Sequence, residues 1–289
     1  MSLNFKIHAP VLLALILLVI TQSGCQIFKR FGTQPDPAPL VFNALPTQNE
    51  LIAQLNSRAS RVRQLQANVD LSLDGVPKLK GTLQLERPDR LRLKAGVMGV
   101  SELGLDVGSN SDLFWVWSKV ALPGQTPAIY YARQQDYQRL QNQAALPIEP
   151  QWIIDASGLV EFPPTDVQQG PFVDPTGRLK LISIRQTPRG PITRVTLLDA
   201  KSALIQQQAV YDASSRLIAY SNSSDFRFYA DQEVSLPHRI ELHVLTPDVQ
   251  DLKMVIDASD YRINALFGDP DQMWSMPKPA GVPVVNLAQ

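Results

Sequence analysis

The chain has 289 residues, with 27 Lys plus Arg against 27 Asp plus Glu, and 44% of its residues are apolar. This neutral balance gives no support for a nucleic-acid partner, which usually requires a basic face, and a single cysteine excludes a disulfide framework. The length suits one large β domain or two smaller ones.

The first residues are typical of a bacterial export signal. After a charged start, the apolar run 11–20 is too short to span a bilayer, and two small residues then precede Cys25. The pattern is similar to the lipobox of bacterial lipoproteins, although Gln22 stands where that motif usually has Leu. We expect residues 1–24 to be a lipoprotein signal peptide and Cys25 to be lipidated. An ordinary signal peptide or a retained signal anchor is the alternative.

A proline-rich tether and a helix are expected next. Residues 25–46 contain four prolines and read as the tether. Thr47 and Glu50 have the spacing of a capping box, in which each side chain bonds a free backbone donor of the other residue. The following apolar residues recur at helical spacing and predict a helix of about 18 residues: Leu51, Leu55, Val62 and Leu65.

The apolar period then changes to two, which predicts a series of antiparallel strands. Arg87-Pro88-Asp89 and residues 109–112 have the composition of hairpin turns. Residues 114–117 are apolar on both faces, as in a strand that is covered on both sides. Twelve segments carry a strand signal: 69–73, 83–85, 91–93, 103–107, 114–117, 129–131, 179–184, 192–198, 209–211, 217–220, 240–245 and 252–256.

Three segments lack this alternation. Pro150 could begin a short helix within residues 147–160, because proline is well tolerated in a first helical turn. Residues 161–177 are rich in Pro and Gly and read as a loop. Residues 266–289 are expected to form a loose C-terminal tail.

The order of helix and hairpins, with the segments GTLQLERPDRLRLKA and LGLDVGSNSDLFWVWSK, resembles the LolA/LolB-like superfamily of lipoprotein carriers and receptors. The resemblance implies a mainly β fold over residues 47–265. This fold is a curved, unclosed antiparallel half-barrel of about eleven strands, with helices over its concave face. In that family, the space between sheet and helices binds the acyl chains of lipoproteins.

The resemblance also implies two sets of site residues. One is an apolar loop between the third and fourth strands, with Val97, Met98 and Val100 as membrane-contact candidates; they could instead fold back onto the core or continue a strand. The other is a lipid cavity. Alternation does not show which face of the sheet lines it, and the same residues could instead be ordinary core residues. Its candidates are Leu71, Leu73, Leu83, Leu85, Leu91, Leu93, Leu105, and either Trp115 and Trp117 or Phe114 and Val116.

No catalytic motif is found, and His238 and His243 are predicted to lie on opposite faces of one strand. We therefore expect no enzyme, no metal site and no cofactor. The expected protein is anchored in the outer membrane, which Gln26 after the cysteine permits, and faces the periplasm. It would bind lipoproteins or another acyl-chain ligand. The alternative is a structural, interaction or sensor lipoprotein; a cavity of hundreds of Å³ would favour binding.

Overall fold

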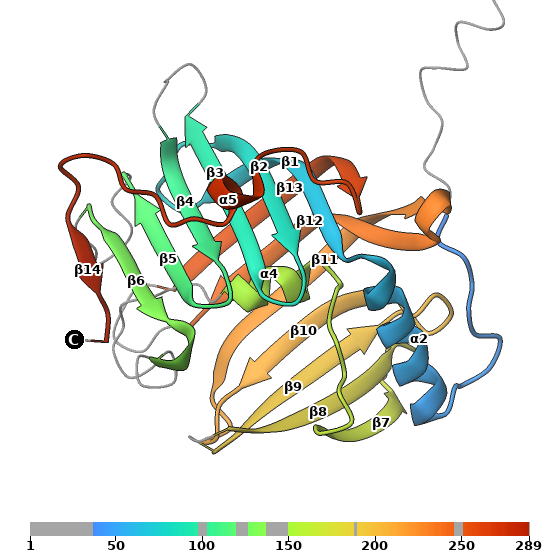
Figure 1. The fold of residues 1–289 in the computed structure, drawn as a ribbon. Coiled ribbons are helices and arrows are strands. Elements are labelled where there is room, and N and C mark those ends of the chain that lie inside the picture. Colours follow the sequence, from blue (N-terminus) through green and yellow to red (C-terminus); the bar gives the residue numbers. More distant parts are fainter. Residues whose placement is uncertain are drawn as a thin grey trace, which may run out of the picture. The chain divides into compact units, whose positions relative to one another are not determined.

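The computed structural model describes residues 37–97, 103–119, 127–136, 150–187, 190–245 and 251–288. These residues belong to one compact unit, Pro37–Gln289, which is drawn in colour in Figure 1. None of the helices in these ranges has the length and apolar character needed to cross a membrane.

The unit is mainly β. Within the described ranges its helices are α2 (Gln48–Arg61), α4 (Pro150–Ala156) and α5 (Pro270–Met273), with short 3-10 turns η2 (Gln134–Asp136) and η3 (Ala230–Gln232). Its strands are β1 (Gln64–Leu73), β2 (Leu79–Glu86), β3 (Arg90–Val97), β4 (Leu103–Ser109), β5 (Leu113–Ser118), β6 (Ile129–Arg133), β7 (Val167–Val173), β8 (Leu179–Thr187), β9 (Gly190–Leu198), β10 (Ile205–Tyr211), β11 (Leu217–Tyr229), β12 (Val234–Val244), β13 (Leu252–Ile263) and β14 (Val284–Asn286).

The strands form one unclosed sheet in the order β14-β6-β5-β4-β3-β2-β1-β13-β12-β11-β10-β9-β8-β7. Neighbours are antiparallel except β14, which pairs with β6 in parallel. The mainly β, open-sheet prediction is confirmed, and each of the twelve predicted segments overlaps a strand. The strand count differs, since the described residues form 14 strands.

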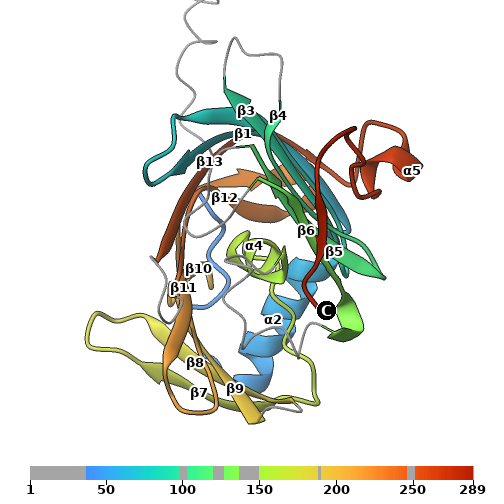
Figure 2. The ribbon, with the colours of Figure 1, turned by 90° about the vertical axis from the view of Figure 1, so that its left-hand side faces the viewer.

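The sheet curves around α4. This helix contacts β4 on one side and β11 and β12 on the other. Six strand-to-strand steps separate β4 from β11, which in a flat sheet would be roughly 29 Å at the usual spacing. A helix is only about 10–12 Å wide, so the sheet must bend to bring both strands to it. Figure 2 shows the strands wrapped around α4 and α2.

The strand register places the predicted leucines on the concave face. Leu83 pairs with Leu93 and Leu85 with Leu91 across β2 and β3, and neighbours in register point to the same side of a sheet. The band continues across the middle of the sheet, where Leu71 of β1 pairs with Ile256 of β13. Alternation along each strand thus produces one continuous apolar surface.

Helix α2 is shorter than predicted. The capping box of Thr47 and Glu50 is confirmed, but the helix ends at Arg61, and Val62 already has an extended backbone. Leu65 lies in β1, because that strand pairs with β2 from Gln64 onward. Val62 and Leu65 continue the helical spacing of α2 in the sequence, but pairing with the sheet outweighs this local preference.

The partly buried side chain of Arg58 fixes α2 to the rest of the unit. It donates hydrogen bonds to the carbonyl oxygens of Ser202 and Ala203, both at 2.7 Å. Burial lowers the pKa of Arg58 to about 10, so the side chain keeps its charge at neutral pH. Two backbone carbonyls that follow β9 thereby gain a charged donor, a stronger partner than a neutral one.

The C-terminal residues do not form a loose tail. Arg92 of β3 donates to the carbonyl oxygens of Met273 and Ser275, and β14 joins the sheet edge. The segment from α5 to β14 crosses the sheet on the side opposite α4 (Figure 2). The expected loop 161–177 also differs, since β7 lies within it and pairs with β8.

Candidate functional site

The concave face is covered by α4, the short helix that begins at Pro150 as the sequence suggested. Ile153 and Ile154 are fully buried in the same apolar cluster as the leucines of β1 to β4. The helix ends at Ala156. Gly158, two residues later, has a φ of +80°, the left-handed conformation common after a helix. The helix therefore fills the space where the sequence predicts a lipid cavity.

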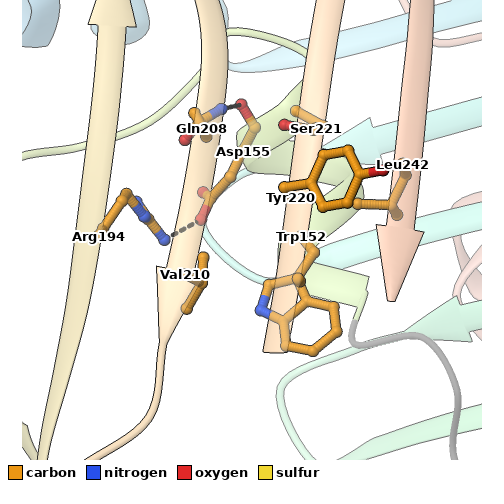
Figure 3. A pocket seen from close by; sticks show the side chains of 10 residues that line it. Trp152, Asp155, Arg194, Gln208, Val210, Tyr220, Ser221 and Leu242 are labelled. Carbon is orange, nitrogen blue, oxygen red and sulfur yellow. Dashed lines mark hydrogen bonds and ion pairs between the residues drawn. The ribbon is translucent and has the colours of Figure 1, made fainter. Parts of the chain in front are cut away.

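Polar contacts hold the last turn of α4. Asp155, which is only 6% exposed, forms an ion pair with Arg194 of β9 (Figure 3). The Asp155 carbonyl accepts a hydrogen bond of 2.8 Å from the Gln208 side chain. The Ala156 carbonyl accepts one of 2.9 Å from Ser223. Three neighbouring strands thus satisfy polar groups at the C-terminal end of a mainly apolar helix.

The segment after α4 is tied to α2. Asn56 on α2 donates to the Phe162 carbonyl oxygen and accepts from the Phe162 amide, both at 2.9 Å. Phe162 and Val160 are buried with Leu51 and Leu55 of α2 in a second apolar cluster. The two helices that cover the sheet are therefore connected through a single structured segment.

A cavity of about 20 Å³ lies between α4 and the sheet, room for about one water molecule. It is lined by the residues drawn in Figure 3, among them Trp152 of α4, Val210 of β10 and Leu242 of β12. Its size is far below the 300–1,000 Å³ of typical ligand pockets. With α4 in place, this part of the chain cannot hold an acyl chain.

The structure brings together all seven predicted cavity leucines. Each is at most 8% exposed, and all belong to the cluster that contains Ile153 and Ile154. The seven are Leu71, Leu73, Leu83, Leu85, Leu91, Leu93 and Leu105. On β5, the sequence left two pairs of residues as alternatives for this face. Val116 of the second pair belongs to this cluster, whereas Phe114 packs with Ala132 and Leu287.

Trp115 and Trp117 lie on the opposite face of the sheet. They form a separate cluster with Ile129, against Met276 and Val282 of the C-terminal segment. The Trp115 indole donates to Asp106 at 3.2 Å. A Cβ on Gly108 would lie 2.2 Å from the Trp115 ring, so only glycine lets the ring rest on β4. The two tryptophans therefore stabilise the C-terminal segment and do not line the concave face.

Most of the other predicted site residues lie outside the part of the chain that the structure describes. Cys25, Met98 and Val100 lie outside the described residues. Val97 ends β3 and is partly buried against the concave cluster, as expected if this part of the loop folds back onto the core.

The histidines lie on opposite faces of β12 and have separate partners. His238 is buried and contacts the Tyr229 hydroxyl at 2.8 Å and the Ala258 carbonyl oxygen at 2.7 Å. His243 stacks on Tyr220, with ring centroids 4.3 Å apart. Within the described ranges, no three His, Cys, Asp or Glu side chains are grouped so that they could hold a metal ion.

Sequence reasoning missed the polar residues that hold α4. Asp155, Arg194 and Gln208 belong to no motif or spacing that marks them in the sequence. The available hint is that Trp152, Ile153 and Ile154 are apolar all round the helix, which is typical of a buried helix. A carboxylate in such a helix requires a charged partner, but the sequence does not say which one.

Comparisons with known proteins give a likeness only in structure. No protein-family model matches the sequence, and no curated protein matches it. The chain is similar to a LolA superfamily protein from Nitrosomonas europaea, at 13% identity and a TM-score of 0.46, over 78% of this chain and 97% of that chain.

Two further solved structures are similar to the same extent. One is a putative outer membrane lipoprotein-sorting protein domain from Vibrio parahaemolyticus, at 13% identity, a TM-score of 0.48 and coverage of 77% and 94%. The other is a DUF1329 family protein from Desulfovibrio piger, at 13% identity, a TM-score of 0.49 and coverage of 76% and 93%. The LolA superfamily that the sequence suggested thus appears among the structural neighbours, but these likenesses transfer no residue role or ligand to this chain.

Proposed function

We propose that the protein is a lipoprotein of the cell envelope that binds acyl chains on its concave face after α4 moves away. It is anchored through acylated Cys25 to the outer membrane, faces the periplasm and takes part in the localisation of other lipoproteins. Mass spectrometry of the native protein tests the anchor, since it reports the modification at residue 25 and any lipid that copurifies.

The observation that carries the proposal is the position of α4. Ile153 and Ile154 supply hydrocarbon to a leucine-lined surface that an acyl chain could cover equally well. The helix has only seven residues, too few to be stable away from its packing partners. A buried ion pair such as Asp155–Arg194 is weak evidence for stability, because desolvation offsets much of its attraction. These features suit a helix that can leave the concave face and return to it.

Titration with a fluorescent fatty acid tests acyl-chain binding. The chain is used from residue 26 onward, so that no anchor competes for the probe. We expect saturable binding, and tighter binding when Arg194→Gln removes the ion-pair partner of Asp155. Arg216→Gln is the matched control, because its partner Asp212 lies at a turn and the Arg216 side chain is 60% exposed.

One observation favours a second function. The space between α4 and the sheet is only about 20 Å³, and such close packing suits a structural or interaction module that binds no lipid. If neither the wild-type chain nor the Arg194→Gln variant binds the fatty acid up to its solubility limit, acyl-chain binding is refuted and the interaction module remains.

A further inference from the structure

Three large apolar side chains are exposed within six residues near the start of the described unit. Leu40 is 66%, Val41 37% and Leu45 61% exposed. No residue from Pro37 to Asn49 is charged. This stretch therefore combines exposed hydrocarbon with the absence of any charge that would resist removal from water.

The stretch is held on the body of the protein. The amides of Val41 and Phe42 donate to the Lys201 carbonyl oxygen at 2.8 and 3.0 Å. Phe42 packs against the cluster between α2 and β8 to β10, and Pro46 is buried. Leu40 and Leu45 thus lie on either side of residues that are fixed to the unit. Both leucines stay exposed, although an apolar cluster lies next to them.

The chain length limits how far this segment lies from the anchor. Fifteen residues lead from Cys25 to Leu40, and a flexible chain of that length has a root-mean-square span of about 20 Å. A lipid on Cys25 would therefore keep Leu40 and Leu45 close to the bilayer surface. This proximity raises the local concentration of lipid around them without any further contact.

We propose that residues 40–45 form a membrane-contact segment, with Leu40 and Leu45 inserted at the headgroup and acyl boundary of the anchoring bilayer. The inference rests on the proposed acylation of Cys25. A short apolar contact added to a lipid anchor is a second attachment of the kind that makes membrane binding stable. It also fixes which side of the unit faces the membrane, which a lipid on Cys25 alone does not.

The test places an environment-sensitive nitrobenzoxadiazole label at residue 45. Acylation leaves Cys25 without a free thiol, so the Leu45→Cys variant of the full-length lipoprotein takes one label. It is reconstituted into phosphatidylethanolamine and phosphatidylglycerol vesicles. Phe267→Cys is the matched control, since Phe267 is 74% exposed and its backbone is held by Gln66 and Gln84, away from the segment.

We expect iodide to quench the label at residue 45 several-fold less than the label at residue 267, and the emission at residue 45 to shift to the blue. Equal quenching at both positions would overturn the proposal. So would a blue shift at residue 45 in a chain that begins at residue 26 and has no vesicles, because that result indicates self-association. A second label, on Cys25, would show that Cys25 is not acylated. That result would refute both this inference and the proposed anchoring. It would leave the proposed acyl-chain binding to be decided by the fatty-acid titration.

Discussion

At the scale of residues, two ion pairs with buried carboxylates, both among the described residues, have different roles. Arg92 and Asp106 are at most 4% exposed in their side chains, and both also bond neighbouring groups of the C-terminal segment or Trp115. Arg194 and Asp155 join α4 to the sheet. The first pair secures a permanent cover on the convex face, whereas the second holds the element that our proposal requires to move.

Replacing Arg92 with Met is expected to destabilise the protein strongly. The change leaves the Asp106 carboxylate buried without its charged partner, which costs about 3–5 kcal/mol. Urea unfolding monitored by circular dichroism measures the loss. Arg239→Met is the control, because its pairs with Glu241 and Asp257 are exposed and worth about 0–1 kcal/mol. Equal losses in the two variants would contradict the assignment.

His238 should make stability depend on pH. The Ala258 carbonyl can only accept, so Nδ1 of His238 carries the proton and Nε2 accepts from the Tyr229 hydroxyl. Burial lowers the pKa of His238 below its usual 6.5 and raises the pKa of Tyr229 to about 12. Below about pH 6.5 the unfolded chain therefore binds a proton that the folded chain does not, and stability falls as the pH decreases.

The measurement is the urea midpoint at pH 7.5 and pH 5.5. We expect a lower midpoint at pH 5.5 in the wild-type chain and a smaller difference in His238→Gln. Carboxylates such as Asp70 and Asp212 have pKa values below 3.8, so they stay charged throughout this range. The charged and titratable groups around His238 are Asp225, Arg227, Tyr229, Asp260 and Tyr261. An unchanged pH difference in the variant would exclude His238 as the source.

At the scale of elements, the alternation of apolar and polar residues predicted most strands, and strands without that alternation were missed. β1 to β4, β6 and β8 to β13 carried the alternation of a strand with one buried face, and β5 was predicted because its residues are apolar on both faces. β7 reads VQQGPFV, without alternation, and becomes a strand only because β8 offers it an edge. β14 has three residues, too few for any period. Alternation predicted correctly that the seven leucines share one apolar face, but the helix that covers them depends on tertiary contacts that no local pattern records.

The N-terminus of α2 provides a direct test of local sequence information. The Thr47 hydroxyl accepts from the Glu50 amide, and the Glu50 carboxylate accepts from the Thr47 amide. Thr47→Ala removes one half of this exchange and should cost about 1 kcal/mol, measured by urea unfolding. Ser57→Ala, at an exposed position inside the helix, should change stability by less than about 0.5 kcal/mol. Similar effects of both changes would contradict the role of the cap.

At the scale of the molecule, the C-terminal segment is an integral part of the fold. Truncation after Gly268 removes α5 and β14, exposes Trp115 and Trp117, and leaves Arg92 without its carbonyl partners. We expect a red shift of tryptophan emission and a lower urea midpoint. Truncation after Leu287 is the control and should change neither. Identical emission and stability of the two truncated chains would show that the segment is dispensable.

The order of the strands also has a consequence for biosynthesis. β1 and β13 are neighbours at the middle of the sheet, yet about 190 residues separate them along the chain. This central seam joins the half made of β1 to β6 with the half made of β7 to β13, and it cannot close until nearly the whole polypeptide has been synthesised. Each half would meanwhile expose a hydrogen-bonding edge, which makes the interval before the last strands emerge the stage at which a chaperone would protect the chain.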